Sequence, residues 1–232
     1  MKTRLLLSSL MLIILSCSKK VTYSPEFIEE TSGRYLFNQD DVIEVFYENN
    51  KLLLKWRGAN KFEPLVIDEN TFFITDLYKK LRFVQHPETK KRYLSVIPKV
   101  DRNQITYDYL KVSDTFKTPS MYLKIGDYQN ALKGFLEIKK QDSTSSLINE
   151  REFNRLGYQF IREKKYLKAI SVLKINASLH PESDNVYDSL AAAYLVNGDS
   201  LLAFNNYKKA LQLNSRNRAA KKYIEAYNTK KN

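Results

Sequence analysis

Along this chain the spacing of the hydrophobic residues changes near residue 115. Before that point apolar and polar residues alternate in short runs such as 51–56, a pattern typical of strands with one buried face. After it, apolar residues recur at every third or fourth position, which indicates helices. The pattern therefore predicts two parts, a β domain at 27–115 and a series of helices at 116–232.

The predicted β domain contains about eight short strand candidates, separated by clusters of turn-forming residues. Strands of this length at such short intervals favour antiparallel pairing between neighbours in the sequence. We therefore expect an antiparallel meander that curls into a sandwich or a small barrel. The expected strands are 34–37, 42–47, 51–56, 65–67, 71–75, 81–85, 92–97 and 105–109.

The helical part repeats its pattern of large and small residues after 34 positions. Gly157, which lies between bulky residues, corresponds in this way to Ala191. A residue with little or no side chain at such a position allows the second helix of a pair to approach the first closely. The repetition therefore predicts two antiparallel helix pairs, at 150–183 and 184–217.

The period and the register of these residues resemble the tetratricopeptide repeat. A shortened form of the same pattern around Ala131 and Phe135 predicts a degenerate first repeat at 116–149. The apolar face of 218–232 predicts the capping helix that an open stack of repeats requires. The expected fold class is therefore α+β, with the antiparallel β meander followed by a short all-α tetratricopeptide array and a C-terminal capping helix.

The segments 154–158 and 185–190 further resemble the helical tail of bacterial serine hydrolases of the penicillin-binding and β-lactamase type. The β domain is similar to the small β domain that lies between the catalytic domain and the repeats of those enzymes. The sequence contains no counterpart of their catalytic domain. The resemblance therefore implies an architecture and not an activity.

The first residues resemble the export signal of bacterial lipoproteins. A basic start precedes an apolar run that is too short to span a bilayer as a stable helix. Residues 14–17 resemble a lipobox, in which the thiol of Cys17 accepts the lipid. The resemblance implies a signal peptide at 1–16 and a lipidated tether at 17–26. Because no aspartate follows Cys17, it also implies the outer membrane, on its periplasmic side or at the cell surface.

The chain has a formal net charge of +12, and removal of a signal peptide with Lys2 and Arg4 leaves 12 − 2 = +10. An exported lipoprotein does not meet nucleic acid, so we expect no nucleic-acid partner. Anionic lipid headgroups, acidic glycans or an acidic protein surface fit this charge better. The basic pairs along the chain are scattered, which indicates a solvated surface for most of them.

The sequence provides few groups for catalysis or for metal binding. Its single cysteine, Cys17, is assigned to the lipid anchor, and neither His86 nor His180 lies in a motif. Ser171 and Lys174 match the nucleophile motif of the related hydrolases, but they fall on a repeat helix without the second motif of those enzymes. We therefore expect no enzymatic activity, no cofactor and no metal, and we keep hydrolysis through Ser171 as the weakest alternative.

Protein binding is the function that the repeats favour. Residues of each first helix, opposite its packing face, are expected to line a groove for an extended peptide with an acidic residue. The same face can instead contact the chain's own β domain or a second copy. A different alternative is a glycan or small ligand bound in the β domain around Trp56. The expected partner-binding residues are Arg151, Asn154, Tyr158, Arg162, Asn185 and Asp188.

The leading hypothesis is a non-enzymatic cell-envelope lipoprotein. It would be anchored in the membrane through Cys17. Its repeats would then bind a protein partner in the envelope, in a scaffolding role or within a homo-oligomer.

Overall fold

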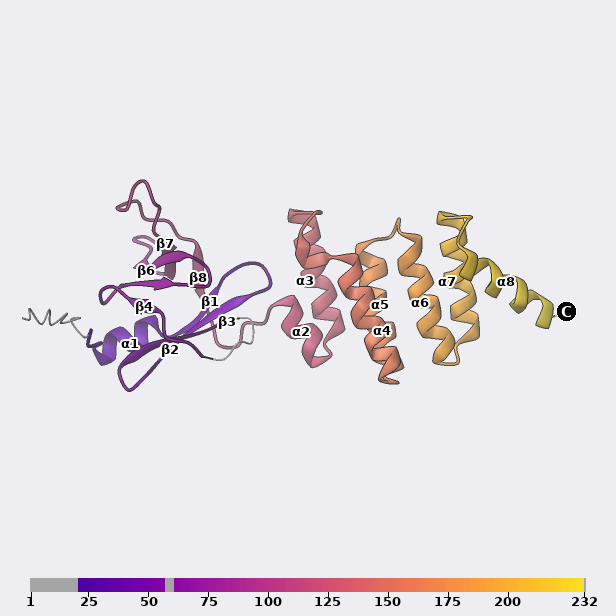
Figure 1. Ribbon diagram of the computed structural model, residues 1–232, viewed down its shortest axis with the longest axis horizontal. Coiled ribbons are helices and arrows are strands. Elements are labelled where there is room, and N and C mark those ends of the chain that lie inside the picture. Colours follow the sequence, from indigo (N-terminus) through magenta and orange to yellow (C-terminus); the bar gives the residue numbers. More distant parts are fainter. Residues whose placement is uncertain (1–20, 57–60, 232) are drawn as a thin grey trace, which may run out of the picture. The chain divides into compact units, whose positions relative to one another are not determined.

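The computed structural model describes residues 21–56 and 61–231 of the chain (Figure 1). The predicted signal peptide and Cys17 lie outside the described residues. Antiparallel strands precede a series of helices, which confirms the α+β class. Contacts divide the chain into two compact units. We call them the β unit, which is 44–110 with the described part of 1–33, and the helical unit, which is 34–43 with the described part of 111–232.

Eight strands form one sheet, hydrogen-bonded in the order β3-β2-β1-β8-β7-β6-β5-β4. The pairings of β1 with β8 and of the consecutive strands from β4 to β8 are antiparallel. Neighbours in the sequence are therefore mostly neighbours in the sheet, as the predicted meander requires. The strands are β1 Gly33–Leu36, β2 Val42–Glu48, β3 Lys51–Trp56, β4 Leu65–Val66, β5 Thr71–Ile74, β6 Lys79–Gln85, β7 Arg92–Val96 and β8 Tyr109–Val112.

The last predicted strand is wrong in its position. The alternation of 105–109 predicted a strand there, but β8 is Tyr109–Val112. The Thr106 hydroxyl donates to the carbonyl of Val96 at 3.1 Å, and the Asp108 carboxylate accepts from the amide of Val96 at 2.7 Å. Polar side chains that bond to the backbone compete with strand pairing. The residues before β8 therefore form a loop.

Helix α1, Pro25–Thr31, was not expected from the sequence. Ser24 caps it by accepting a hydrogen bond from the amide of Phe27 at 3.1 Å, and a proline occupies its first turn. Tyr23, which the tether prediction left in solvent, is buried and stacks on Phe27 with 5.5 Å between the ring centroids. The end of the predicted tether at 17–26 thus belongs to the folded β unit.

Alternate side chains of the strands fill the interior of the β unit. Leu52, Leu81 and Leu94 are almost completely buried. Phe83 packs against Phe72 with 5.3 Å between the ring centroids. The interior is therefore a packed apolar core.

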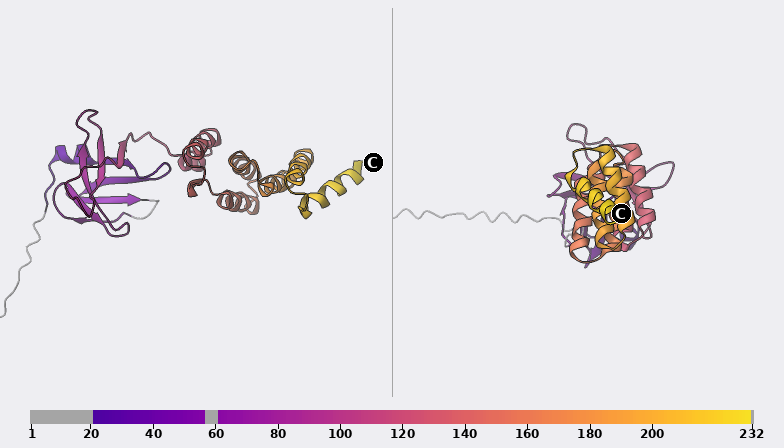
Figure 2. Two further views of the ribbon diagram at one scale, coloured as in Figure 1. Left: turned by 90° about the horizontal axis from the view of Figure 1, so that it is seen from above. Right: turned by 90° about the vertical axis from the view of Figure 1, so that its right-hand side faces the viewer.

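The helical unit contains antiparallel helix pairs that stack on one another (Figures 1 and 2). Helices α4 and α6 begin at residues 150 and 184, and α5 and α7 begin at 166 and 200. Both pairs of starting points are 34 residues apart, so the arrangement is tetratricopeptide-like. The helices are α2 Pro119–Ile125, α3 Tyr128–Gln141, α4 Glu150–Arg162, α5 Tyr166–Leu179, α6 Asp184–Val196, α7 Ser200–Leu213 and α8 Arg218–Lys231, with the 3-10 turn η1 Ser146–Ile148 before α4.

The close approach of α4 and α5 depends on the glycine that the repeat pattern singled out. A Cβ atom at Gly157 would lie 2.6 Å from the Cγ atom of Leu173 on α5. That distance is too short for two carbon atoms, so no larger residue fits without a shift. The predicted role of Gly157 in helix approach is therefore confirmed.

Helix α2 has 7 residues, whereas α4 has 13. Its start is fixed by Asp40, whose Oδ1 accepts a hydrogen bond from the amide of Ser120 at 2.7 Å. Thr118 caps the same end by accepting from the amide of Met121 at 3.3 Å. The first helix pair is therefore built on a short helix that a buried carboxylate holds in place.

Two apolar clusters connect the helix pairs. In the first, Phe135 of α3 meets Phe153 of α4 edge to face, with 5.1 Å between the ring centroids, and both pack with buried residues of α5. In the second, Leu173 of α5 packs with Leu190 of α6 and with buried residues of α7 and α8. The array thus has a continuous interior in which α5 belongs to both clusters.

Candidate partner-binding surface of the helical unit

Three of the predicted partner-binding residues are exposed on α4. They are Arg151, Tyr158 and Arg162, and the Tyr158 side chain is 37% exposed. These side chains are available to a partner. The sequence prediction placed them on one helix face, and α4 does present them to solvent.

Asn154 has a different role in the structure. It is buried, and its side-chain oxygen accepts a hydrogen bond from Nδ2 of Asn176 on α5 at 3.0 Å. The same Asn176 nitrogen also donates to the backbone carbonyl of Glu150 at 3.0 Å. The Asn176 amide nitrogen thus bonds to two groups of α4, whereas its side-chain oxygen is buried without a partner among the described residues. Asn154 therefore joins α4 to α5 and is not available to a peptide.

Asn185 and Asp188 both lie on α6 but differ in exposure. Asn185 donates from Nδ2 to Oε1 of Glu150 at 2.8 Å, which links α6 to α4. Asp188 is half-buried beside Asp184, whose Oδ2 accepts from Nδ2 of Asn217 at 3.1 Å. Burial raises the pKa of Asp188 above the ordinary range of aspartate. Asn185 is therefore exposed but bonded to Glu150, whereas Asp188 is half-buried within the array.

The turns between paired helices expose an apolar surface that the sequence analysis did not identify. Ile125 is 63% exposed, Leu167 is 72% exposed and Leu201 is 62% exposed. The three turns lie along one edge of the array (Figure 1). Exposed apolar side chains that recur along one edge of a domain are candidates for an interaction site. We call this surface the turn edge, and it consists of Ile125, Leu167, Leu195, Val196, Leu201 and Leu202.

The three turns have the same backbone geometry. Each contains a residue in the left-handed region, with φ of 84° at Gly126, 58° at Lys164 and 91° at Gly198. After each of these residues an amide donates back to a carbonyl five residues earlier, as from Asp199 to Tyr194 at 2.9 Å. This is the Schellman arrangement that ends many helices. Leu167 and Leu201 are the third residue after the left-handed residue of their turns, whereas Ile125 directly precedes Gly126.

A pocket of about 620 Å³ lies at the turn edge, between α2 and the pair α4 and α5. Its apolar wall includes Leu156 and Phe160 of α4, which also pack against the cluster around Phe135. Ile125 and Leu167 of the turn edge also line it. The pocket can therefore take a side chain of a partner that lies along the edge. The remaining lining residues are Ser120, Leu123, Lys124, Gly126, Tyr128, Lys168 and Ser171.

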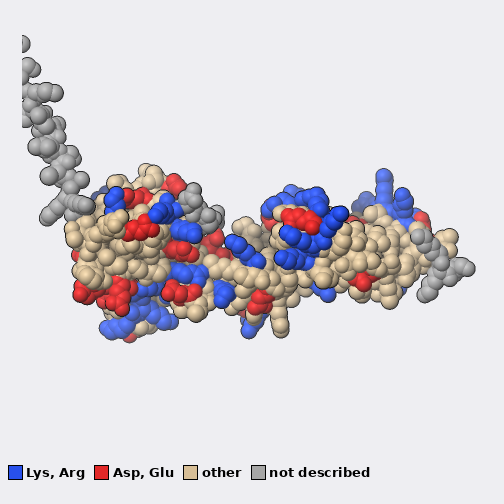
Figure 3. Space-filling model, turned by 90° about the horizontal axis from the view of Figure 1, so that it is seen from below, with Lys and Arg blue, Asp and Glu red and all other residues tan. Residues whose placement is uncertain are grey.

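The charge of this pocket is positive. Lys124 and Lys168 line it, both are exposed, and no carboxylate does so. Neither lysine forms an ion pair within the part of the chain that the structure describes. On the face shown in Figure 3, basic side chains are spread over both units with acidic ones among them. The two pocket lysines therefore lie beside an apolar site whose lining has no carboxylate.

The groups considered for chemistry have structural partners. Ser171 donates its hydroxyl to the carbonyl of Leu167 at 2.9 Å, and the ammonium of Lys174 lies 5.8 Å from the ring centroid of Tyr194. The serine and the lysine are thus not arranged as a nucleophile and its base. Between residues 21 and 56 and between 61 and 231, no group of three or more acidic, histidine or cysteine residues is placed to hold a metal ion.

Within the described part of the chain, no helix combines the length and the apolar character that crossing a membrane requires.

No family model matches the chain, and no curated protein matches it. Solved structures similar to part of the chain include the first tetratricopeptide domain of Spaghetti (RPAP3) bound to the HSP90 peptide SRMEEVD, which is 20% identical over 48% of this chain and 85% of that one, with a TM-score of 0.34. The first such domain of human RPAP3 is 20% identical over 48% and 84%, with a TM-score of 0.34. MamA from Desulfovibrio magneticus is 21% identical over 49% and 62%, with a TM-score of 0.33. The tetratricopeptide-like arrangement itself rests on the helix pairs and their spacing.

Proposed function

We propose that the helical unit binds a protein partner through the turn edge and its pocket. The observation that supports this is an exposed leucine at the same position of successive helix pairs, Leu167 and Leu201, which are 34 residues apart. Exposed apolar side chains are costly in water, and no residue of the array covers them. A partner that covers the edge would remove this cost.

The chemistry of the pocket defines the segment that fits it. An apolar side chain of the partner would fill the space between Ile125 and Leu167. A carboxylate beside it would face Lys124 and Lys168, which have no acidic neighbour of their own in the pocket. We therefore infer a peptide segment that combines a large apolar residue with an aspartate or glutamate.

The proposal is tested by capture of crosslinked partners from cell envelopes with matched variants. The edge variant, Ile125→Ser with Leu167→Ser, removes two exposed apolar side chains of the turn edge. The control, Leu136→Ser with Tyr158→Ser, removes two others that are 40% and 37% exposed and lie elsewhere on the unit. We expect some proteins to be captured by the unchanged chain and by the control but not by the edge variant. Loss in the control alone would support the groove on α4 instead, and equal capture by all three would refute the proposal.

Synthetic peptides test the chemistry of the partner. We expect peptides with a leucine or phenylalanine next to an acidic residue to bind more tightly than peptides with lysine at the acidic position. Substitution of Lys124→Gln and Lys168→Gln should remove that difference and leave the binding of the lysine peptide unchanged. A preference for the lysine peptide would contradict the inferred partner. Sedimentation of the chain alone shows whether a second copy occupies the edge instead.

We further propose that the protein is an envelope lipoprotein anchored through Cys17, as the lipobox-like residues 14–17 suggest. Several acyl chains would then hold it at the membrane, because each buried methylene group contributes about 0.8 kcal/mol. The expected result is incorporation of labelled palmitate and recovery in the membrane fraction, both lost in Cys17→Ser. Membrane recovery of that variant without acylation would exclude the anchor.

A further inference from the structure

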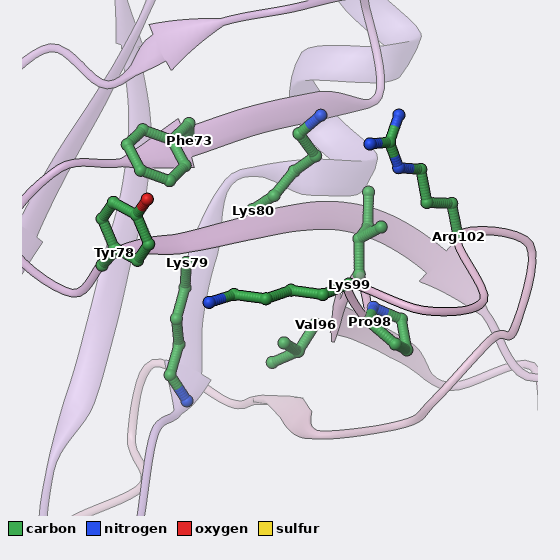
Figure 4. Close-up of a pocket in the computed structure, with 9 residues that line it drawn as sticks. Phe73, Tyr78, Lys79, Lys80, Val96, Pro98, Lys99 and Arg102 are labelled. Atoms are coloured by element: carbon green, nitrogen blue, oxygen red, sulfur yellow. The ribbon is translucent and has the colours of Figure 1, made fainter.

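A second pocket, of about 600 Å³, lies in the β unit and does not involve Trp56 (Figure 4). It is formed by the turn between β5 and β6, the first residues of β6, the end of β7 and the loop that follows β7. One wall is aromatic and the floor is apolar. The lining residues are Phe73, Tyr78, Lys79, Lys80, Val96, Ile97, Pro98, Lys99 and Arg102.

The pocket gathers positive charge without a counter-charge. Lys79, Lys80, Lys99 and Arg102 line it, and no carboxylate does. None of the four forms an ion pair with a described residue. Lys79 donates to the hydroxyl of Tyr109 at 3.0 Å, and the Lys99 ammonium lies 5.3 Å from the ring centroid of Tyr78, so the head groups of Lys80 and Arg102 are the ones left for a ligand. Cations held together in a concave site attract anions.

Tyr78 has a backbone conformation that is unfavourable for a tyrosine. Its φ of 50° lies in the left-handed region, where glycine or asparagine is the usual choice at the end of a hairpin turn. Its side chain is nevertheless 73% exposed. The ring meets Phe73 edge to face at 5.6 Å between centroids, and the Lys99 ammonium lies 5.3 Å from the centroid of Tyr78. The strained turn thus presents an aromatic ring to the pocket that does little for the core.

We propose that this pocket binds a phosphate ester, with the phosphate among the cations and the attached organic group against the rings. Lys80 and Arg102, with Lys99 beside the ring of Tyr78, suit a group with a charge close to −2 better than a single carboxylate. Arg102 can bind two phosphate oxygens at once, and the lysines act as point charges beside it. In the view of Figure 4, Lys80 and Arg102 extend toward the same side, and Lys99 extends toward Tyr78. The proposal does not depend on the function of the helical unit.

Titration calorimetry with glucose 6-phosphate, inorganic phosphate and glucose tests the site on the full mature chain. We expect binding of the ester and of phosphate, no binding of glucose, and weaker binding as salt is raised. Lys99→Gln with Arg102→Gln should weaken the binding of the ester by at least about tenfold, because two charge-assisted hydrogen bonds are lost. The matched control is Lys55→Gln with Lys91→Gln, which removes two exposed lysines of the β unit outside the pocket. It should change affinity by less than about twofold.

The ring is tested separately with Tyr78→Asn, since asparagine tolerates the left-handed backbone. This variant should bind the ester more weakly and should bind inorganic phosphate as tightly as the unchanged chain does. Vesicles of phosphatidylcholine with and without phosphatidic acid then distinguish the source of the phosphate. Binding of both acidic vesicles and sugar phosphate means that the phosphate group itself is recognised, and binding of the vesicles alone means a lipid headgroup. Equal loss in the pocket variant and its control, or no binding of any phosphate probe, would overturn the proposal.

Discussion

At the scale of single residues, one register position behaves differently in two helix pairs. Gly157 has no room for a Cβ atom beside Leu173, whereas Ala191, 34 residues later, fits its own pair and is completely buried. The repeat therefore requires a small residue at this position, but the exact limit depends on the local distance between helices. A sequence pattern shows that a small residue is required, but it does not show how close the two helices come.

We expect Gly157→Ala to destabilise the helical unit by about 1–3 kcal/mol, because the forced shift outweighs a gain of about 1 kcal/mol in helix propensity. In a Leu173→Ala background the three atoms nearest to the added methyl group are removed, so the same substitution should be neutral or stabilising. Urea denaturation followed by circular dichroism at the helix band measures all four chains of the cycle. An equal cost in both backgrounds would rule out the Leu173 contact as the cause.

The half-buried carboxylate of Asp188 gives a prediction about pH. Burial raises its pKa above the unfolded value, with a smaller contribution from Asp184, while a hydrogen bond from Asn217 opposes the rise. The folded state therefore binds a proton more readily than the unfolded state. The stability that this group contributes is then present below the unfolded pKa of about 3.9 and is lost as pH rises through the folded pKa.

Asp188→Asn removes this titration and keeps the shape of the side chain. The free energy of unfolding of the variant minus that of the unchanged chain should increase as pH rises above about 4 and then level off. Denaturation at a series of pH values measures this difference. A constant difference across the series would show that Asp188 has the same pKa in both states.

At the scale of elements, the last helix covers the open side of α7. Ala220 of α8 is completely buried, and Tyr223 lies 4.7 Å from Tyr207 between ring centroids. Phe204 packs against Tyr227 at 4.5 Å in the same way. The helix thus packs against apolar groups of α7, while Lys221 and Lys222 are exposed.

Removal of α8 by a stop after Asn217 should therefore lower the free energy of unfolding by about 3 kcal/mol and promote aggregation. The estimate reflects the loss of contact at Tyr207 and at its neighbours on α7. Thermal denaturation with light scattering measures both effects. A stop after Thr229, which leaves these contacts in place, is the control, and a similar loss in both chains would contradict a capping role.

At the scale of the whole molecule, each unit has its own core, and the single tryptophan lies in only one of them. Trp56 is on β3, whereas nearly all of the helix content is in the helical unit. Tryptophan fluorescence therefore reports on the β unit and the helix band of circular dichroism on the helical unit. We expect Phe135→Ala, in the helical core, to shift the dichroism transition and to leave the fluorescence midpoint in place. Equal shifts in both signals would show that the units unfold together.

The sequence predicted most of the fold because local patterns control it. Strands β1 to β7 follow the alternation of side chains, and only the last strand was misplaced, since Thr106 and Asp108 bond to the backbone of β7 instead of extending the ladder. The candidate site was less predictable. Asn154 and Arg151 look alike on a helical wheel, but one bonds to Asn176 on the next helix and the other is exposed.

One signal for the turn edge was present in the sequence. Leu167 and Leu201 recur with the period of the repeat, at positions that the packing pattern does not require. Their exposure could be recognised only once the helices were placed, because a repeated leucine is equally compatible with burial.

By itself the sequence determined the α+β class, the 34-residue helix pairs and the need for a small residue at Gly157, because these depend on side-chain period and size along the chain. The tertiary structure decided which polar residues are used between helices, that Ile125 and Leu167 line one pocket, and that four cations line a pocket of the β unit. Those features join residues far apart in the sequence. They depend on distances that only the packing of helices and strands sets.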